Sequence, residues 1–206
     1  MNKSKEKIER SLGMKLFLKG DRCNSPKCVM VRRPSRPGAH GAKRRRAPSE
    51  FGSQLMEKQR IRASYGLREA QLSEIVAKAM DKKGAIGTGD LIIEMLERQF
   101  ANVVFRLGLA NSRTIARQLI SHGHFLVNKK KIRAPFYPLK VGEVVSIIPK
   151  SKELLIFKDL SDKLKKYDTL EWLFLDKEKL EGKLLALPKD LELPFDINLI
   201  VDYYSK

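Results

Sequence analysis

Arginine and small polar side chains are concentrated between residues 113 and 124. Arg113 and Arg117 are four residues apart, so a helix places both guanidinium groups on one face. Guanidinium groups donate paired hydrogen bonds to phosphate oxygens, which makes this face a candidate phosphate-binding site. The polar residues that accompany the arginines are Gln118, Ser121, His122 and His124. The alternative is the solvated face of an ordinary amphipathic helix; in both cases we expect the two arginines to be dispensable for the fold.

Two other basic groups are candidates for contact with a polyanion. Residues 32–48 are rich in Arg, Pro, Gly and Ser and have too little apolar surface to offset their ordering entropy. We therefore weigh a disordered tail against an extended arm that becomes ordered on phosphates, and favour the arm. Its central run is Lys43, Arg44, Arg45 and Arg46. The other group lies on a predicted helix that begins at Ser49, and its members are Lys58, Arg60 and Arg62.

Hydrophobic spacing predicts the elements that position these residues. Apolar residues at helical spacing, with capping residues, predict helices over 49–64, 68–81, 88–107 and 113–122. Alternation then predicts strands over 125–127, 131–133 and 144–148. The tight turn Asn128-Lys129 leaves its type open, because Asn tolerates left-handed geometry and Lys does so at a cost. A charged helical segment is expected over 152–166, and a strand or a docked tail over 198–204.

The charge of the chain indicates a polyanionic partner. Lys and Arg number 42 against 24 Asp and Glu, a net charge of +18. The excess is +12 in residues 1–75 and +7 in residues 91–150, whereas residues 151–206 carry −2. Two separate basic blocks are typical of two contact surfaces on a long polyanion. Two cysteines exclude a disulfide-rich scaffold, and no apolar segment approaches the ~20 residues of a membrane span, so we expect an intracellular protein without membrane contact.

One domain-length segment and four shorter ordered motifs resemble one ribosomal protein family. Residues 98–145 resemble the small RNA-binding domain that is named after small-subunit ribosomal protein four. The remaining motifs of that family, in order, are Leu16–Gly20, Pro37–Gly41, Gln54–Gly66 and Leu199–Lys206. The resemblance extends over nearly the whole chain and is to the bacterial form of the family.

The resemblance implies an α+β fold and a non-catalytic role. It implies a basic arm over 1–48, a helical domain over 49–90 on which residues 191–206 pack, and a second domain over 91–190 with the RNA-binding domain at about 98–160. Members bind small-subunit ribosomal RNA early in assembly. They lie beside ribosomal proteins five and twelve where messenger RNA enters, and contribute to decoding accuracy. The basic run of residues 43–46 matches that region, and the implied location is cytoplasmic and ribosome-bound.

Two other functions are compatible with the same small domain. RNA-modifying enzymes such as pseudouridine synthases carry it beside a catalytic domain, and stand-alone RNA chaperones carry it without a long C-terminal extension. The sequence contains no Gly-rich phosphate loop, HExxH motif or nucleophile elbow, so we expect neither an enzyme nor a small-molecule substrate.

The cysteine pair resembles half of a zinc site found in some members of the family. Cys23 and Cys28 match its downstream half, but Glu6 and Glu9 stand where the upstream cysteines belong. Structural zinc prefers four thiolate or imidazole ligands, and nothing in the spacing demands His40 as a further ligand. We therefore expect two reduced thiols and no cofactor.

Overall fold

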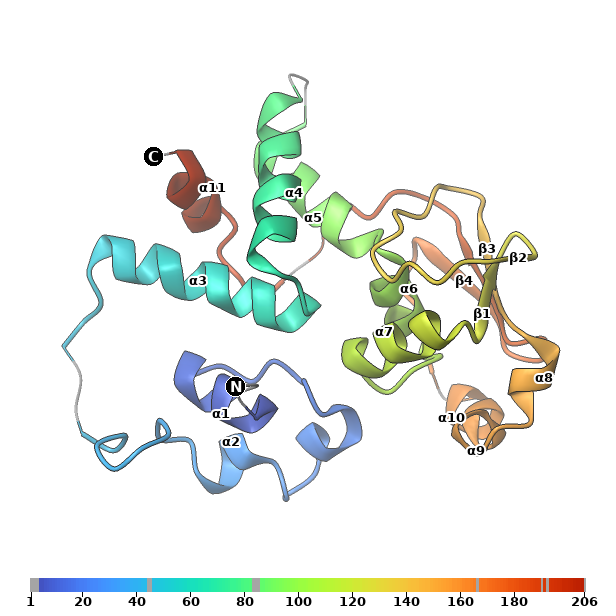
Figure 1. Cartoon of the computed structure of the whole chain (residues 1–206), viewed down its shortest axis with the longest axis horizontal. Coiled ribbons are helices and arrows are strands. Elements are labelled where there is room, and N and C mark those ends of the chain that lie inside the picture. Colours follow the sequence, from blue (N-terminus) through green and yellow to red (C-terminus); the bar gives the residue numbers. More distant parts are fainter. Residues whose placement is uncertain are drawn as a thin grey trace. The chain divides into compact units, whose positions relative to one another are not determined.

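The protein has an α+β fold made of two compact units. The computed structural model describes residues 4–205 except 44–45, 83–85, 166, 190 and 192. The first unit contains residues 1–92 and 191–206, and the second contains residues 93–190. All elements described in the first unit are helical, whereas the second combines helices with an antiparallel sheet (Figure 1).

Three helices form the centre of the first unit: α3 (Glu50–Tyr65), α4 (Glu69–Asp81) and α11 (Asn198–Ser205). The Ser49 hydroxyl accepts a hydrogen bond from the Gly52 amide at 3.2 Å and so caps α3, which ends at Gly66 with a left-handed φ of 66°. α11 comes from the far end of the chain and packs against α3 and α4. The side chains buried at this centre are Ile61, Leu72, Val76 and Ile200.

The C-terminal segment is a helix, so the strand expected as one alternative over 198–204 is wrong. Ile197, Ile200 and Tyr204 are spaced by three and four residues, which places them on one face of a helix. Both isoleucines are buried. The Asp196 carboxylate accepts a hydrogen bond from the Asn198 amide at 3.0 Å and thereby satisfies an amide where α11 begins.

Residues 4–32 are folded, which corrects the extended arm expected over 1–48. They form α1 (Lys5–Leu12), the 3₁₀ helix η1 (Gly20–Asn24) and α2 (Val29–Arg32), and α1 packs against α2 and α3. Apolar residues that look isolated in the sequence are brought together here and buried; they are Leu16, Leu18, Cys23 and Cys28. The segment that follows has no helix or strand in its described part, and Arg10 holds its beginning through the carbonyl oxygens of Ser35 and Arg36, at 2.7 and 3.2 Å.

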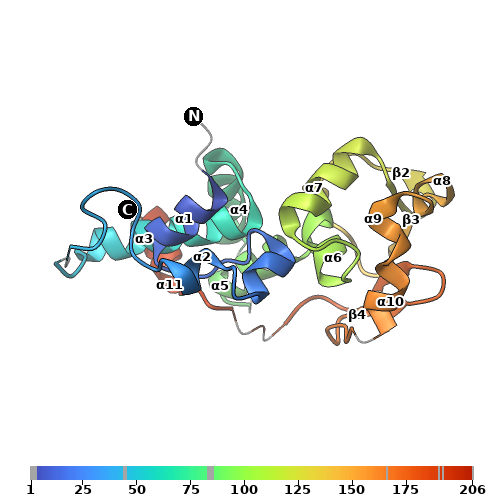
Figure 2. The ribbon, with the colours of Figure 1, turned by 90° about the horizontal axis from the view of Figure 1, so that it is seen from below.

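Five antiparallel strands form the sheet of the second unit, in the order β2-β1-β3-β5-β4. The strands are β1 (Phe125–Val127), β2 (Lys130–Lys131), β3 (Val144–Ile147), β4 (Leu173–Asp176) and β5 (Glu181–Leu184). Figure 2 labels β2, β3 and β4. β5 was not expected from the sequence, since Glu-Gly-Lys-Leu has no strand-like alternation. It forms because Gly182 allows β5 to approach Leu107 closely: a Cβ at Gly182 would lie 2.7 Å from Leu107 Cδ2.

The helix expected over 88–107 is two helices, α5 (Thr88–Glu97) and α6 (Phe100–Arg106). The chain is extended at Gln99, and the first amides of α6 bond elsewhere: Phe100 donates to the Tyr137 carbonyl and Ala101 to the Pro135 carbonyl, both at 2.9 Å. Carbonyl groups of a loop distant in sequence thus accept the hydrogen bonds that carbonyl groups of the preceding helical turn would accept in a continuous helix. The spacing of apolar residues alone could not show the break between α5 and α6.

The remaining helices of the second unit are α7 (Arg113–His122), α8 (Pro149–Lys152), α9 (Leu155–Lys158) and α10 (Leu160–Lys165). The single charged helix expected over 152–166 is therefore a series of short ones. The turn between β1 and β2 is resolved: Asn128 and Lys129 both have left-handed φ values, 48° and 65°, as a type I′ hairpin turn requires. No helix in the described ranges combines the length and apolar character needed to cross a membrane.

Candidate nucleic-acid interface

α7 has one buried face and one polar face. Its first turn is capped by the Ser112 hydroxyl, which accepts from the Ile115 amide at 3.3 Å, and it ends at Gly123 with a φ of 77°. Ala116, Leu119 and Ile120 are buried, and the helix packs against α6. Gln118, Ser121 and His122, which the sequence placed on the polar face, are exposed, as is Thr114.

Arg113 does not lie on this open polar face, which corrects its expected position. Its Nε donates to Asn102 Oδ1 at 2.7 Å, and its guanidinium group lies 4.7 Å from the centre of the Phe105 ring. Its side chain is only 15% exposed. Arg113 therefore joins α7 to α6 and contributes to the packing of the second unit.

Glu97 organises this junction, and sequence reasoning missed it. Its side chain is fully buried, yet its two carboxylate oxygens accept from Arg106 Nη2 and Nε, at 2.9 and 3.0 Å. Asn102 Nδ2 adds a bond of 2.8 Å, and Arg113 Nη2 lies 3.9 Å away. A buried carboxylate is tolerated only where charged and hydrogen-bonding partners surround it. A Glu inside an apolar stretch is the sequence signal that could have identified this site.

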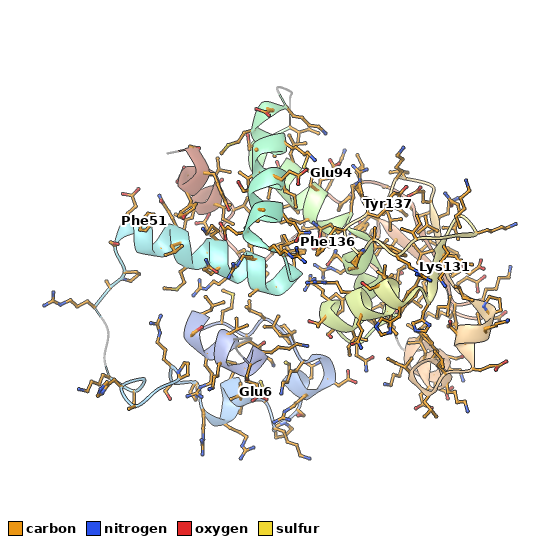
Figure 3. All side chains as sticks on the ribbon, in the orientation of Figure 1. Glu6, Phe51, Glu94, Lys131, Phe136 and Tyr137 are labelled. Atoms are coloured by element: carbon orange, nitrogen blue, oxygen red, sulfur yellow. The ribbon has the colours of Figure 1, made fainter. Side chains whose placement is uncertain are left out.

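Arg117 remains partly exposed, and its guanidinium group lies 5.1 Å from the centre of the half-buried Phe136 ring (Figure 3). A ring beneath a guanidinium group restricts its orientation without removing its charge from solvent. Arg113 and Arg117 both have intermediate exposure, and they differ in their partners: Arg113 contacts α6, whereas Arg117 contacts the ring of Phe136.

Basic side chains also gather around Gly123, where α7 ends. A Cβ at Gly123 would lie 3.0 Å from Lys131 Nζ and 3.1 Å from Arg133 Nε, so both cations lie over this glycine (Figure 3 labels Lys131). His124 contacts Ser151 Oγ through Nδ1 at 3.0 Å. Burial lowers the pKa of the His124 imidazole, and the charges of His122 and Lys131 act in the same direction. We refer to His122, His124, Lys131 and Arg133 as the Gly123 cluster.

For Lys131 and Arg133 the sequence predicts a strand but no contact with phosphate. Their spacing of two residues is the signal that could have placed them on one side of the extended chain. The Gly123 cluster thus extends the predicted phosphate-binding face from the end of α7 onto the residues that follow β1.

The basic group on α3 is not an exposed face, which corrects its predicted placement. Lys58 is buried: its Nζ donates to Glu69 Oε1 at 2.7 Å and to the Tyr203 hydroxyl at 3.0 Å. Arg60 donates to the Leu12 carbonyl at 3.1 Å and pairs with Glu57. Only Arg62 is substantially exposed, with Glu69 3.7 Å away. Residues two apart diverge around a helix, so these three never share one face.

The Lys58 contacts attach α11 to α3 and α4. The Lys58 ammonium group lies 4.2 Å from the centre of the Tyr203 ring, and the Tyr204 hydroxyl donates to Glu69 Oε1 at 3.0 Å. Phe51, at the beginning of α3 in Figure 3, stacks on Tyr203 with ring centres 5.7 Å apart. The ammonium group of Lys58 is therefore engaged within the fold, by Glu69 and Tyr203.

The basic run of the N-terminal segment is described in part. Lys43 and Arg46 are exposed, while Arg44 and Arg45 lie outside the described residues. The described residues therefore leave two cations of this run exposed at the surface.

The two carboxylates that stand where a zinc site would have its upstream cysteines have other partners in this structure. Glu9 is 1% exposed and its Oε1 accepts from the amides of Leu16 and Leu18, at 3.1 and 3.2 Å. Glu6 pairs with Lys19 and Arg22, at 3.0 and 3.3 Å. Both carboxylates that replace cysteines are thus committed to other partners, and in the described part of the chain no three His, Cys, Asp or Glu side chains are grouped to hold a metal. Burial raises the pKa of the Cys23 thiol, which favours its neutral form.

Comparison with known proteins agrees with this architecture. Residues 1–97 match the family profile described as the Ribosomal protein S4/S9 N-terminal domain, and residues 100–145 match the S4 domain. The small ribosomal subunit protein uS4 of Thermus thermophilus is 43% identical over 199 residues, which cover 96% of this chain and 94% of that protein. The chain belongs to the uS4 family. The uS4 proteins of Caldicellulosiruptor bescii and Syntrophomonas wolfei are each 44% identical over the same shares of both chains.

Proposed function

We propose that this uS4 protein is a primary binder of small-subunit ribosomal RNA. The observation that carries the proposal is the Gly123 cluster, which gathers basic side chains at the end of α7 within the part of the chain that matches the S4 domain. Arg117 and the exposed lysines of the β1–β2 hairpin, Lys129 and Lys130, extend the positive surface. Clustered cations of this kind neutralise phosphates and release counterions.

Recognition would depend on shape and charge more than on base sequence. A-form RNA presents its phosphates and 2′-hydroxyls in a shallow minor groove, and rigid protein elements can bridge two segments of that backbone. In the second unit, the buried Glu97 junction keeps α6 and α7 in a fixed arrangement, so the polar residues of α7 meet the RNA with little ordering cost.

The proposal includes a place in assembly. As a primary binder, the protein would dock early on a junction of RNA helices and nucleate the body of the subunit. Lys43 and Arg46 would face the side where messenger RNA enters, next to ribosomal proteins five and twelve, and so influence decoding accuracy. The role is structural, not enzymatic, and is exercised on cytoplasmic ribosomes.

The dependence of binding on salt tests the electrostatic mechanism. With about 6–10 phosphate contacts, the affinity of the full chain for small-subunit ribosomal RNA should fall about 10³–10⁵-fold between about 50 and about 200 mM salt. A filter-binding titration at several salt concentrations measures this slope. A nearly flat response would refute the mechanism.

Two matched double variants, each of which removes two positive charges, test where the RNA-binding surface lies. The double variant Lys131→Ala/Arg133→Ala should weaken binding and reduce the salt slope by about two contacts. Lys165→Ala/Lys179→Ala is the control, because these side chains are 70% and 73% exposed but lie outside the two basic blocks. Equal losses from both double variants would show that the total charge matters and that the Gly123 cluster has no special role.

A further inference from the structure

Phe17 is a large apolar residue that the fold holds at the surface. It is 45% exposed, whereas its neighbours Leu16 and Leu18 are buried. Its φ is 55°, in the left-handed region that a bulky side chain rarely adopts. This combination of exposure and strain persists only where the surrounding structure imposes it, and such sites are concentrated at functional surfaces.

Glu9 imposes the conformation. One oxygen of its buried carboxylate accepts from the Leu16 amide at 3.1 Å and from the Leu18 amide at 3.2 Å. The two amides on either side of Phe17 therefore converge on one atom, and the residue between them is turned outward. The turn closes where the Gly20 amide donates to the Phe17 carbonyl at 3.2 Å. Glycine or asparagine would adopt this backbone more easily, so turn formation alone does not account for a phenylalanine.

A cation accompanies the exposed ring. Lys15 Nζ lies 4.8 Å from the centre of the Phe17 ring. The surrounding segment is basic, with seven Lys and Arg against three Asp and Glu between residues 5 and 27. Lys19 and Arg22 pair with Glu6, whereas Lys15 is placed against the ring.

An aromatic ring beside a lysine suits one chemical class of ligand. An unpaired nucleobase stacks on an aromatic face, and the phosphate of the same nucleotide is then within reach of a nearby ammonium group. The positive charge of this segment matches an anionic ligand. We propose that Phe17 and Lys15 form a stacking site for an unpaired base of the bound RNA, presented by the Glu9 carboxylate. This inference rests on the proposed RNA-binding function and assigns it a contact in the first unit.

Stacking and charge contribute differently to the salt dependence, which allows a direct test. Phe17→Leu retains an apolar side chain but removes the stacking face, so affinity for small-subunit ribosomal RNA should fall about tenfold at every salt concentration with an unchanged slope. Phe17→Trp keeps the face and should bind within about twofold of the unchanged protein. Lys15→Ala should reduce the slope by about one contact.

The matched control is Phe174→Leu. Phe174 lies on β4 and is 54% exposed, and its replacement should leave affinity unchanged. Equal RNA affinity of Phe17→Leu and the unchanged protein would overturn the stacking site. If the variant bound RNA normally but were lost from assembled subunits, the ring would contact a protein instead of a base. Failure of the unchanged protein to bind the RNA, or a flat salt response, would instead refute the proposed function.

A stability measurement separates a binding role from a packing role. Phe17→Gly relieves the left-handed strain and removes an exposed ring, so the midpoint of thermal unfolding should be equal or higher while RNA affinity falls about tenfold. A clearly lower midpoint would show that the ring stabilises the fold and would overturn the inference.

Discussion

Replacing Arg113 by alanine should destabilise the second unit. The change removes the 2.7 Å bond from Arg113 Nε to Asn102, a residue that is 1% exposed, and leaves a buried acceptor without this donor. Such a loss costs about 1–3 kcal/mol. The guanidinium group also leaves the Phe105 ring, a contact worth about 0.5–1 kcal/mol. Together these contacts predict a decrease of about 1.5–4 kcal/mol in the free energy of unfolding.

Urea unfolding followed by tryptophan fluorescence measures this loss. Trp172 is the only tryptophan, is buried and belongs to the same unit as Arg113. Arg117→Ala is the matched control, since its guanidinium group lies against the Phe136 ring, and should cost less than about 1 kcal/mol. Equal losses for the two variants, or a loss below about 0.5 kcal/mol for Arg113→Ala, would refute the structural role of Arg113.

A double-mutant cycle identifies the interaction responsible. In an Asn102→Ala background the acceptor is already absent, so Arg113→Ala should cost about 1 kcal/mol less than in the unchanged protein. Purely additive losses would show that the hydrogen bond between Asn102 and Arg113 contributes nothing measurable, and the reasoning from the 2.7 Å contact would be wrong.

Three other outcomes are expected. Burial alone would raise the pKa of Glu69, but hydrogen bonds from Lys58 and Tyr204 outweigh it and hold that pKa below its usual range. The stability Glu69 supplies is therefore complete above the ordinary glutamate pKa and lost as pH falls through the lowered value; urea unfolding should show an acid-side decrease that Glu69→Gln reduces. Metal analysis should find well under one zinc per chain, and a chelator should leave thermal unfolding unchanged; stoichiometric zinc that survives dialysis would contradict this. Trypsin should cut free protein within residues 32–48 and fail to do so in assembled subunits, whereas full protection in the free protein would contradict the proposed ordering of this segment on RNA.

Elements defined by local signals were predictable from the sequence. α3, α4 and α7 each combine apolar residues at helical spacing with a terminating residue close in sequence, and Gly66 and Gly123 take the left-handed φ that ends two of these helices. The hairpin β1–β2 follows equally from period-two spacing around a two-residue turn. In these elements the residues that determine the structure are only a few positions apart in the sequence.

Features set by distant partners were not predictable in this way. The break between α5 and α6 depends on carbonyl groups of residues 135 and 137, and β5 depends on pairing with β3 and β4. The hydrogen bonding of the Lys58 ammonium group depends on Tyr203, which is 145 residues away in the sequence. Residue type and spacing showed which cations the chain possesses but not which of them the folded chain neutralises.

Two buried carboxylates, Glu97 and Glu9, explain part of that difference. In a chain with an excess of Lys and Arg, a buried carboxylate can accept hydrogen bonds either from a cationic side chain or from the backbone amides of a turn, and so hold that group in one position. Glu97 does the first, since it fixes Arg106 and contacts Arg113 beneath α7. Glu9 does the second, since it holds two amides and turns Phe17 outward. Substituting Glu97 or Glu9 should therefore alter RNA binding through geometry, although neither carboxylate is exposed enough to meet a phosphate.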